Sequence, residues 1–153
     1  MAVEDVRKFF TERGYKDPVF EMDESSATVE LAAKAVGVEP GRIAKTLSFK
    51  LKDRDILIVT KGDARIDNKK FKKCFRTKAK MLSAEEVLET TGHPVGGVCP
   101  FALKTPLNVY LDVSLKEYDS VYPAAGSGNS ALEIAPDDMK NLTDAEWVDV
   151  CQQ

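Results

Sequence analysis

Apolar residues recur at helical spacing in several segments, each bounded by residues that start or stop helices. The first segment covers residues 3–13 and ends at Gly14, a residue typical of helix C-termini. A second helix is predicted to begin at Ser25 or Ser26 and to end at Gly37. Four more helices are predicted at residues 67–75, at 83–91 from a capping-box pattern, from Pro136 onward, and as a final short helix capped by residues 143–146.

Strand-like segments lie between these helices in an irregular order. Residues 45–52 and 56–61 are typical of two strands joined by a polar hairpin connection. Shorter strands are predicted at residues 18–22, 108–113, 120–125 and 131–134. Because no βαβ unit repeats, we expect a mixed or mainly antiparallel sheet in an α/β fold of the α+β kind, formed by one domain over residues 1–153.

The alternation of side chains along the first long strand gives Lys45 an unusual place. Lys45 falls on the same side as the apolar residues Leu47, Phe49 and Leu51, whereas Thr46 falls on the other side. A lysine at the start of an apolar face either extends its ammonium group to the rim or lines a cavity. The pattern favours the cavity only slightly.

Composition narrows the class of protein. With 43% hydrophobic and 31% charged residues among 153, the chain is typical of a folded protein, and no apolar run approaches the roughly 18 to 20 residues that span a bilayer. Three cysteines without a Cys-x-x-Cys pair and a single histidine, His93, argue against a disulfide framework and a metal centre. We therefore expect a cytoplasmic protein without a cofactor, a metal or a membrane partner.

The net charge of −3 conceals a division along the chain. Residues 1–80 hold 19 Lys and Arg against 13 Asp and Glu, a net +6, whereas residues 81–153 hold 3 against 12, a net −9. Nine of the basic residues fall within residues 61–80, beside only Asp63 and Asp67. Such a cluster indicates a phosphate-bearing partner bound at one face or, alternatively, an ordinary solvated helix face.

Two segments rich in glycine are candidates for binding. Residues 92–101 hold three glycines and two prolines with almost no charge, which is typical either of main chain presented to a ligand or of a bulged strand. Residues 126–131 spell G-x-G-x-x-A, but a strand-like run follows where a dinucleotide site needs a helix. A loop between strands is therefore the better interpretation of the second segment.

Cys99 and His93 are the only residues that could act as a cysteine nucleophile and its base. In an extended chain, six residues separate them by about 20 Å, so the chain would have to double back at Gly96 and Gly97. The alternative is that His93 is a turn residue and Cys99 a small buried apolar side chain.

Three stretches of sequence, in this order and spacing, resemble the YbaK-like editing domains associated with prolyl-tRNA synthetase. They are Ile-Ala-Lys-Thr-Leu at 43–47, Thr-Gly-His-Pro-Val-Gly-Gly-Val-Cys-Pro-Phe at 91–101 and Leu-Glu-Ile-Ala-Pro-Asp-Asp-Met at 132–139. The similarity runs essentially from end to end of the chain. It implies a compact domain around a strongly curved, barrel-like mixed sheet flanked by helices.

The resemblance also implies a trans-editing hydrolase that cleaves the ester bond of a mischarged aminoacyl-tRNA, here a proline tRNA carrying a small non-cognate amino acid such as cysteine or alanine. Lys45 matches the family's catalytic lysine. The substrate-binding residues implied are Thr46, Gly96, Gly97, Val98, Pro100, Phe101, Gly126 and Ser127. The basic cluster, chiefly Lys69, Lys70, Lys72 and Lys73, would contact tRNA phosphates. The partners implied are an aminoacylated tRNA 3′ end and, as an open alternative, an aminoacyl-tRNA synthetase, but neither DNA nor a membrane.

The sequence departs from some relatives at two places. Residues 126–129 read Gly-Ser-Gly-Asn where several members carry a basic Gly-Gly-Lys-Arg-Gly, and Cys99 stands where serine is common. Two other hypotheses stay open: a module that binds tRNA ends or a nucleotide-like ligand without turnover, and an unrelated hydrolase that depends on Cys99.

Overall fold

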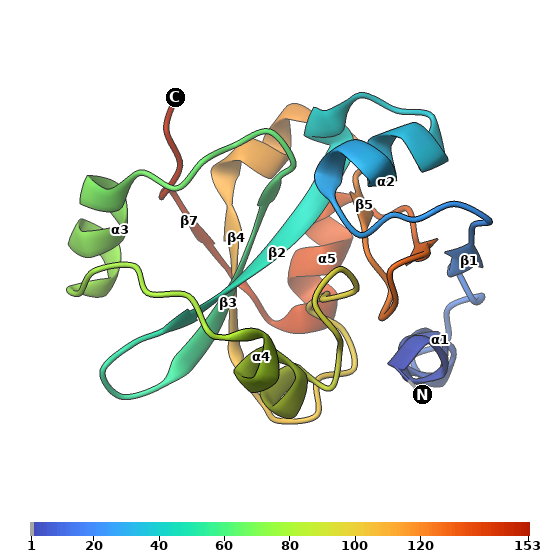
Figure 1. The fold of residues 1–153 in the computed structure, drawn as a ribbon, viewed down its shortest axis with the longest axis horizontal. Helices are drawn as coiled ribbons and strands as arrows, with labels where there is room; N and C mark the ends of the chain where they lie inside the picture. Colours follow the sequence, from blue (N-terminus) through green and yellow to red (C-terminus); the bar gives the residue numbers. More distant parts are fainter. Residues whose placement is uncertain (1) are drawn as a thin grey trace.

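Local sequence signals set most helix boundaries in the computed structural model, which describes residues 2–153 (Figure 1). The α-helices are α1 (Ala2–Glu12), α2 (Val29–Val36), α3 (Asn68–Phe75), α4 (Ala84–Thr91) and α5 (Pro136–Thr143). The predicted capping box at Ser83 is confirmed, and Gly37 and Gly92 end α2 and α4 in the left-handed conformation. The predicted start of α2 is wrong, because Thr28 rather than Ser25 or Ser26 accepts the capping hydrogen bond.

The larger of two sheets is mixed and has the strand order β5-β2-β3-β4-β7. Its strands are β2 (Ile43–Lys50), β3 (Asp55–Lys61), β4 (Asn108–Asp112), β5 (Tyr122–Pro123) and β7 (Glu146–Val148). The predicted hairpin is confirmed as the antiparallel pair β2–β3, and the other three pairings are parallel. The smaller sheet pairs β1 (Phe20–Glu21) with β6 (Ser130–Ala131), and short 3-10 helices cover Pro40–Arg42 and Val113–Glu117. A mixed α/β fold in one domain is therefore confirmed.

The predicted strongly curved, barrel-like sheet is wrong. The end strands β5 and β7 do not pair with each other in the described part of the chain, so the sheet stays open. These end strands contain only two and three residues, which offer too few main-chain bonds to close a barrel. The segment that follows β5 instead joins the separate two-stranded sheet through β6.

The predicted final helix at residues 143–146 is also wrong. Asp144 adopts a left-handed φ of 54° and donates its N–H to Lys140, which ends α5. The next residues extend as β7, which pairs with β4 in the register Tyr110 to Glu146. Strand pairing and the partial burial of Trp147 therefore override the local helix signal.

Two apolar clusters cover the two faces of the sheet. Alternate residues of β3 divide between them: Leu57 and Val59 face one cluster, whereas Ile56 and Ile58 face the other. The first cluster includes side chains of α1 and α5, and the second includes Phe71 of α3. In Figure 1, α3 and α1 lie at opposite ends of the molecule. No helix among residues 2–153 is long and apolar enough to cross a membrane.

Candidate functional site

A cavity of about 440 Å³ opens along the outer edge of β2, and this volume is typical of small-molecule sites. Figure 1 shows α2 near one end of β2 and α4 near the other, with the loop that follows α4 between them. The lining is mostly apolar. It consists of Ser26, Ala27 and Thr28 before α2, Val29, Ala32 and Val36 from α2, residues 43–48 of β2, Met81 and Leu82 before α4, Ala84 and Val87 from α4, Val95, Gly96 and Val98 from the loop, and Tyr122, Ala124, Ser130 and Ala131 from the segments around β5 and β6.

Lys45 is a cationic residue of this lining and is half-buried. Its ammonium group donates a hydrogen bond to the carbonyl oxygen of Ala64, in the loop after β3. Burial lowers the pKa of Lys45, and the neighbouring carboxylates of Asp63 and Glu30 oppose part of that shift. The structure thus places Lys45 at a cavity, the arrangement that the strand pattern slightly favoured.

The loop at residues 92–101 contributes its tip to the cavity, where Gly96 and Val98 are lining residues. Gly97 lies behind them and contacts the later glycine loop: the N–H of Gly126 donates to the Gly97 carbonyl at 2.9 Å. A Cβ atom at position 97 would lie 2.4 Å from the main-chain nitrogen of Ser127, so this close approach requires glycine. Gly97, Gly126 and Ser127 therefore hold two loops together and are not among the residues that line the cavity.

Pro100 and Phe101 lie in the interior and also do not line the cavity. The Phe101 side chain is fully buried against α1, with its ring centroid 4.9 Å from that of Phe10 and 5.7 Å from that of Phe9. This contact attaches the end of the loop to the core. The family resemblance implies a place for Phe101 in the substrate pocket, whereas its side chain belongs to the core.

The chain does double back between His93 and Cys99, whose Nε2 and Sγ atoms lie 3.6 Å apart. This geometry does not make a nucleophile, because His93 Nε2 also lies 2.7 Å from the Phe101 carbonyl oxygen and must carry the proton to bond there. Cys99 is fully buried, and burial raises the pKa of its thiol to about 12. A thiol of this kind stays protonated at neutral pH and out of reach of a substrate, which argues against the Cys99 hydrolase.

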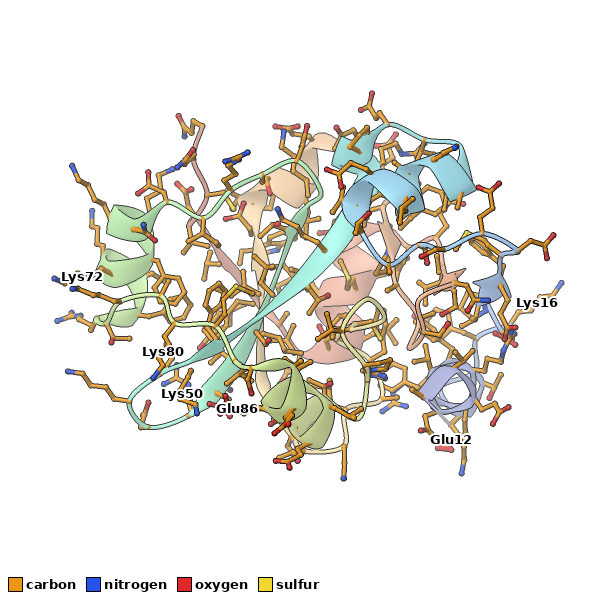
Figure 2. All side chains as sticks on the ribbon, viewed as in Figure 1. Glu12, Lys16, Lys50, Lys72, Lys80 and Glu86 are labelled. Atoms are coloured by element: carbon orange, nitrogen blue, oxygen red, sulfur yellow. The ribbon has the colours of Figure 1, made fainter. Side chains whose placement is uncertain are left out.

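The four lysines assigned to tRNA phosphates all lie on α3. Lys69, Lys72 and Lys73 are exposed, whereas Lys70 donates to Asp149 and to the Cys151 carbonyl, each at 3.0 Å. Figure 2 shows Lys72 on α3 and Lys80 between it and the Lys50–Glu86 ion pair, which joins β2 to α4. Lys80 directly precedes Met81, a residue of the cavity lining. The basic surface therefore extends toward the cavity through the segment between α3 and α4.

Sequence reasoning missed the contributions of α2 and α4 to the cavity. The small residues Ala32 and Ala33 of α2 predict close packing, and the structure shows that they pack with Ile43 at the start of β2. Met81 is 57% exposed and Val95 65% exposed, so the rim of the cavity is apolar as well. No group of three or more His, Cys, Asp or Glu side chains within residues 2–153 is arranged to hold a metal ion.

The chain is similar to several known proteins along most of its length. A family model described as "Aminoacyl-tRNA editing domain" matches residues 23–142. The chain is 51% identical over 154 residues to "Uncharacterized protein YwhH" of Bacillus subtilis, covering 99% of this chain and 98% of that protein. It is 30% identical over 138 residues to "Putative Cys-tRNA(Pro)/Cys-tRNA(Cys) deacylase EbsC" of Enterococcus faecalis, covering 89% and 84%. The solved structure of "a putative trans-editing enzyme for prolyl tRNA synthetase" superposes with a TM-score of 0.90 at 32% identity, covering 99% of this chain and 98% of that one.

Proposed function

Because the chain belongs to the family of aminoacyl-tRNA editing domains, which acts on aminoacyl-tRNA, we propose that it is a free-standing deacylase that hydrolyses the ester of a mischarged tRNA. The observation that carries this proposal is the cavity beside β2, which holds the half-buried Lys45 on an otherwise mostly apolar wall. Its volume and lining suit a small aminoacyl group together with part of the terminal nucleotide. We expect this reaction to take place in the cytoplasm.

An aminoacyl ester is already activated, so the site needs to orient the ester, to stabilise charge on its carbonyl oxygen and to admit a water molecule. This chemistry needs neither a metal nor a protein nucleophile, which agrees with the burial of Cys99. Lys45 supplies a fixed cation in a partly dry site, where its attraction to an anionic or polarised group is stronger than in bulk water.

The proposed substrate is a proline tRNA that carries a small non-cognate amino acid, with cysteine and alanine as the first candidates. The printed names of two relatives, which mention Cys-tRNA(Pro) and prolyl-tRNA synthetase, support this choice. The lysines Lys69, Lys70, Lys72 and Lys73 of α3 would bind tRNA phosphates, and the 3′ end would reach the cavity past Lys80. An aminoacyl-tRNA synthetase is a further proposed partner, which could release the mischarged tRNA to this protein.

The test is deacylation of proline tRNA charged with Ala, Cys, Ser or Pro by the wild type and by Lys45→Ala. Lys8→Ala is the matched control, because Lys8 lies on α1 with its side chain 74% exposed and is not part of the cavity lining. We expect the wild type and Lys8→Ala to hydrolyse one non-cognate ester selectively, and Lys45→Ala to lose about 10²-fold or more in rate without unfolding. Binding of these tRNAs without hydrolysis of any ester would favour a binding module instead.

A further inference from the structure

The outer edge of β2 is covered at both ends but interrupted in the middle, beside the cavity. At one end, β5 pairs with Ile43 and Ala44. At the other end, residues 80–82 pair with the strand: Lys50 donates its N–H to the Lys80 carbonyl at 2.8 Å, and Leu82 donates to the Ser48 carbonyl at 3.2 Å. Among residues 2–153, no strand pairs on this side with the stretch between Ala44 and Ser48.

The direction of the main-chain groups in this stretch follows from the same hydrogen bonds. Ser48 and Lys50 point their main-chain groups to the outer edge, and successive residues of a strand alternate in direction. Lys45 and Leu47 therefore turn their N–H and C=O groups inward to β3, with which they pair in register. Thr46 turns its N–H and C=O outward, into the interruption, and Thr46 is itself a residue of the cavity lining.

The side chain of Thr46 adds a second, independent observation. Its hydroxyl oxygen is buried and has no hydrogen-bond partner among residues 2–153. Buried polar groups in proteins are almost always paired, so the unpaired hydroxyl of a residue that lines the cavity calls for a partner such as an ordered water or a bound ligand. Thr46 therefore combines outward main-chain groups at the cavity with a buried hydroxyl that has no partner within residues 2–153.

From this geometry we propose that the aminoacyl group binds as a one-residue β-strand in the interruption, paired with the main chain of Thr46. The inference rests on the deacylase function proposed above. In a hydrogen-bonded antiparallel pair, two residues exchange both N–H···O=C bonds. The Thr46 N–H would donate to the ester carbonyl oxygen, and the α-ammonium group of the substrate would donate to the Thr46 C=O.

This arrangement makes the Thr46 N–H a catalytic group of the reaction. Water attacks the carbonyl carbon, the new C–O bond places negative charge on the carbonyl oxygen, and the N–H bonds that oxyanion. The bond from the carbonyl carbon to the ribose oxygen then breaks, and the ribose oxygen leaves with the electron pair and takes up one proton of the water. The products are the free amino acid as a carboxylate, the tRNA 3′-terminal hydroxyl and one proton released to solvent.

The pairing also defines the class of substrate. The groups that it recognises are the ester carbonyl and the free α-amine, which every aminoacyl ester shares, so discrimination among amino acids is left to the cavity walls. Esters without the α-ammonium group lose the charge-assisted bond to the Thr46 carbonyl. The site is therefore specific for aminoacyl esters over α-hydroxyacyl esters of the same size.

The first experiment compares two variants of the full chain on Ala-tRNA(Pro) and Cys-tRNA(Pro). Thr46→Val removes the hydroxyl and keeps the N–H, whereas Thr46→Pro removes the N–H as well. Proline is accepted in a strand where its nitrogen faces no partner strand, as at this position. We expect kcat for Thr46→Pro to be about 10²-fold below that for Thr46→Val, because one preorganised donor to an oxyanion is worth roughly 10²- to 10³-fold. Circular dichroism checks that both variants fold.

The second experiment needs no variant and decides the matter if Thr46→Pro does not fold. The wild type is given Ala-tRNA(Pro) and the same tRNA with its alanyl group deaminated to lactyl, and each enzymatic rate is divided by the spontaneous hydrolysis rate of that ester. We expect the acceleration to be at least about tenfold lower for the lactyl ester.

The outcomes separate this inference from the proposed function. Two results would overturn the pairing and leave the deacylase function intact, provided that the wild type hydrolyses a charged proline tRNA. One is an equal rate for Thr46→Pro and Thr46→Val, and the other is equal acceleration of the alanyl and lactyl esters. A wild type that hydrolyses none of the charged proline tRNAs would overturn both.

Discussion

Replacement of Gly97 by alanine tests whether the two glycine loops are held together as described. The added Cβ would lie 2.4 Å from the nitrogen of Ser127 and 2.7 Å from the carbonyl carbon of Gly126. Both contacts are with main chain, so no side chain can rotate away, and the loops must separate by about 1 Å to reach ordinary contact. That movement would also break the 2.9 Å hydrogen bond from the Gly126 N–H to the Gly97 carbonyl.

The expected loss of stability follows from these two effects. Overpacking costs about 1 to 3 kcal/mol, and the lost hydrogen bond adds about 0.5 to 1.5 kcal/mol. A loss of about 3 kcal/mol in the free energy of unfolding lowers Tm by about 6 to 12 °C for a domain of this size. Urea unfolding and thermal melting of the wild type and of Gly97→Ala measure both quantities.

Gly128→Ala is the matched control in the same pair of loops. A Cβ atom at position 128 would meet only the Ala27 methyl group, at an ordinary 3.7 Å. We expect this variant to stay within about 0.5 kcal/mol of the wild type. Equal stability of Gly97→Ala and Gly128→Ala would refute the close approach of the loops.

Three further predictions concern charge and chemistry. Replacement of Lys69, Lys70, Lys72 and Lys73 by Gln should weaken tRNA binding and flatten its dependence on salt in a filter-binding titration, whereas an unchanged slope would mean that α3 is merely solvated. Treatment of the native protein with iodoacetamide should label the exposed Cys74, leave the buried Cys99 unmodified and preserve deacylation, as checked by mass spectrometry and a rate assay. Loss of activity on modification of Cys99 would contradict its burial. Hydrogen bonds with Lys50 and with Ser83, the capping residue of α4, lower the pKa of Glu86 from 4.5 to about 2. The contribution of Glu86 to stability is therefore complete above pH 4.5 and is lost as the pH falls toward 2. Glu86→Gln should therefore flatten the fall of stability between these pH values in urea titrations, and an unaltered fall would show that the ion pair is absent in solution.

The features that the sequence predicts well are those set by neighbours along the chain. A capping box needs only Ser83 and Glu86, and a left-handed helix end needs only a residue such as Gly92. Residues 143–146 carry a similar local pattern, yet the structure uses them to end α5 and begin β7. The difference arises from β4, which lies more than thirty residues earlier and offers its free edge to β7.

The candidate site shows the same limit. The pattern of β2 places Lys45 beside apolar residues, and the lysine lies at a cavity. The distance along the chain between His93 and Cys99 does not predict their contact, because the chain turns at Gly97, where a bond to the Pro94 carbonyl closes the turn and a bond from the distant Gly126 N–H joins it to another loop. Similarly, burial of Phe101 depends on the aromatic side chains of α1, which no spacing within the loop reveals.

The short interruption in the edge of β2 also bears on how the protein avoids self-association. An unpaired strand edge invites pairing with a strand from another molecule, and such pairing leads to aggregation. Here β5 and residues 80–82 pair with β2 on either side of the opening, so few outward main-chain groups, chiefly those of Thr46, are available to a strand from another molecule. Strands in proteins usually have several residues. A strand of that length could pair with β2 at the opening only by displacing β5 or residues 80–82. The fold can therefore keep this part of the β2 edge unpaired without promoting aggregation, because the opening is too short to accept a strand from another molecule.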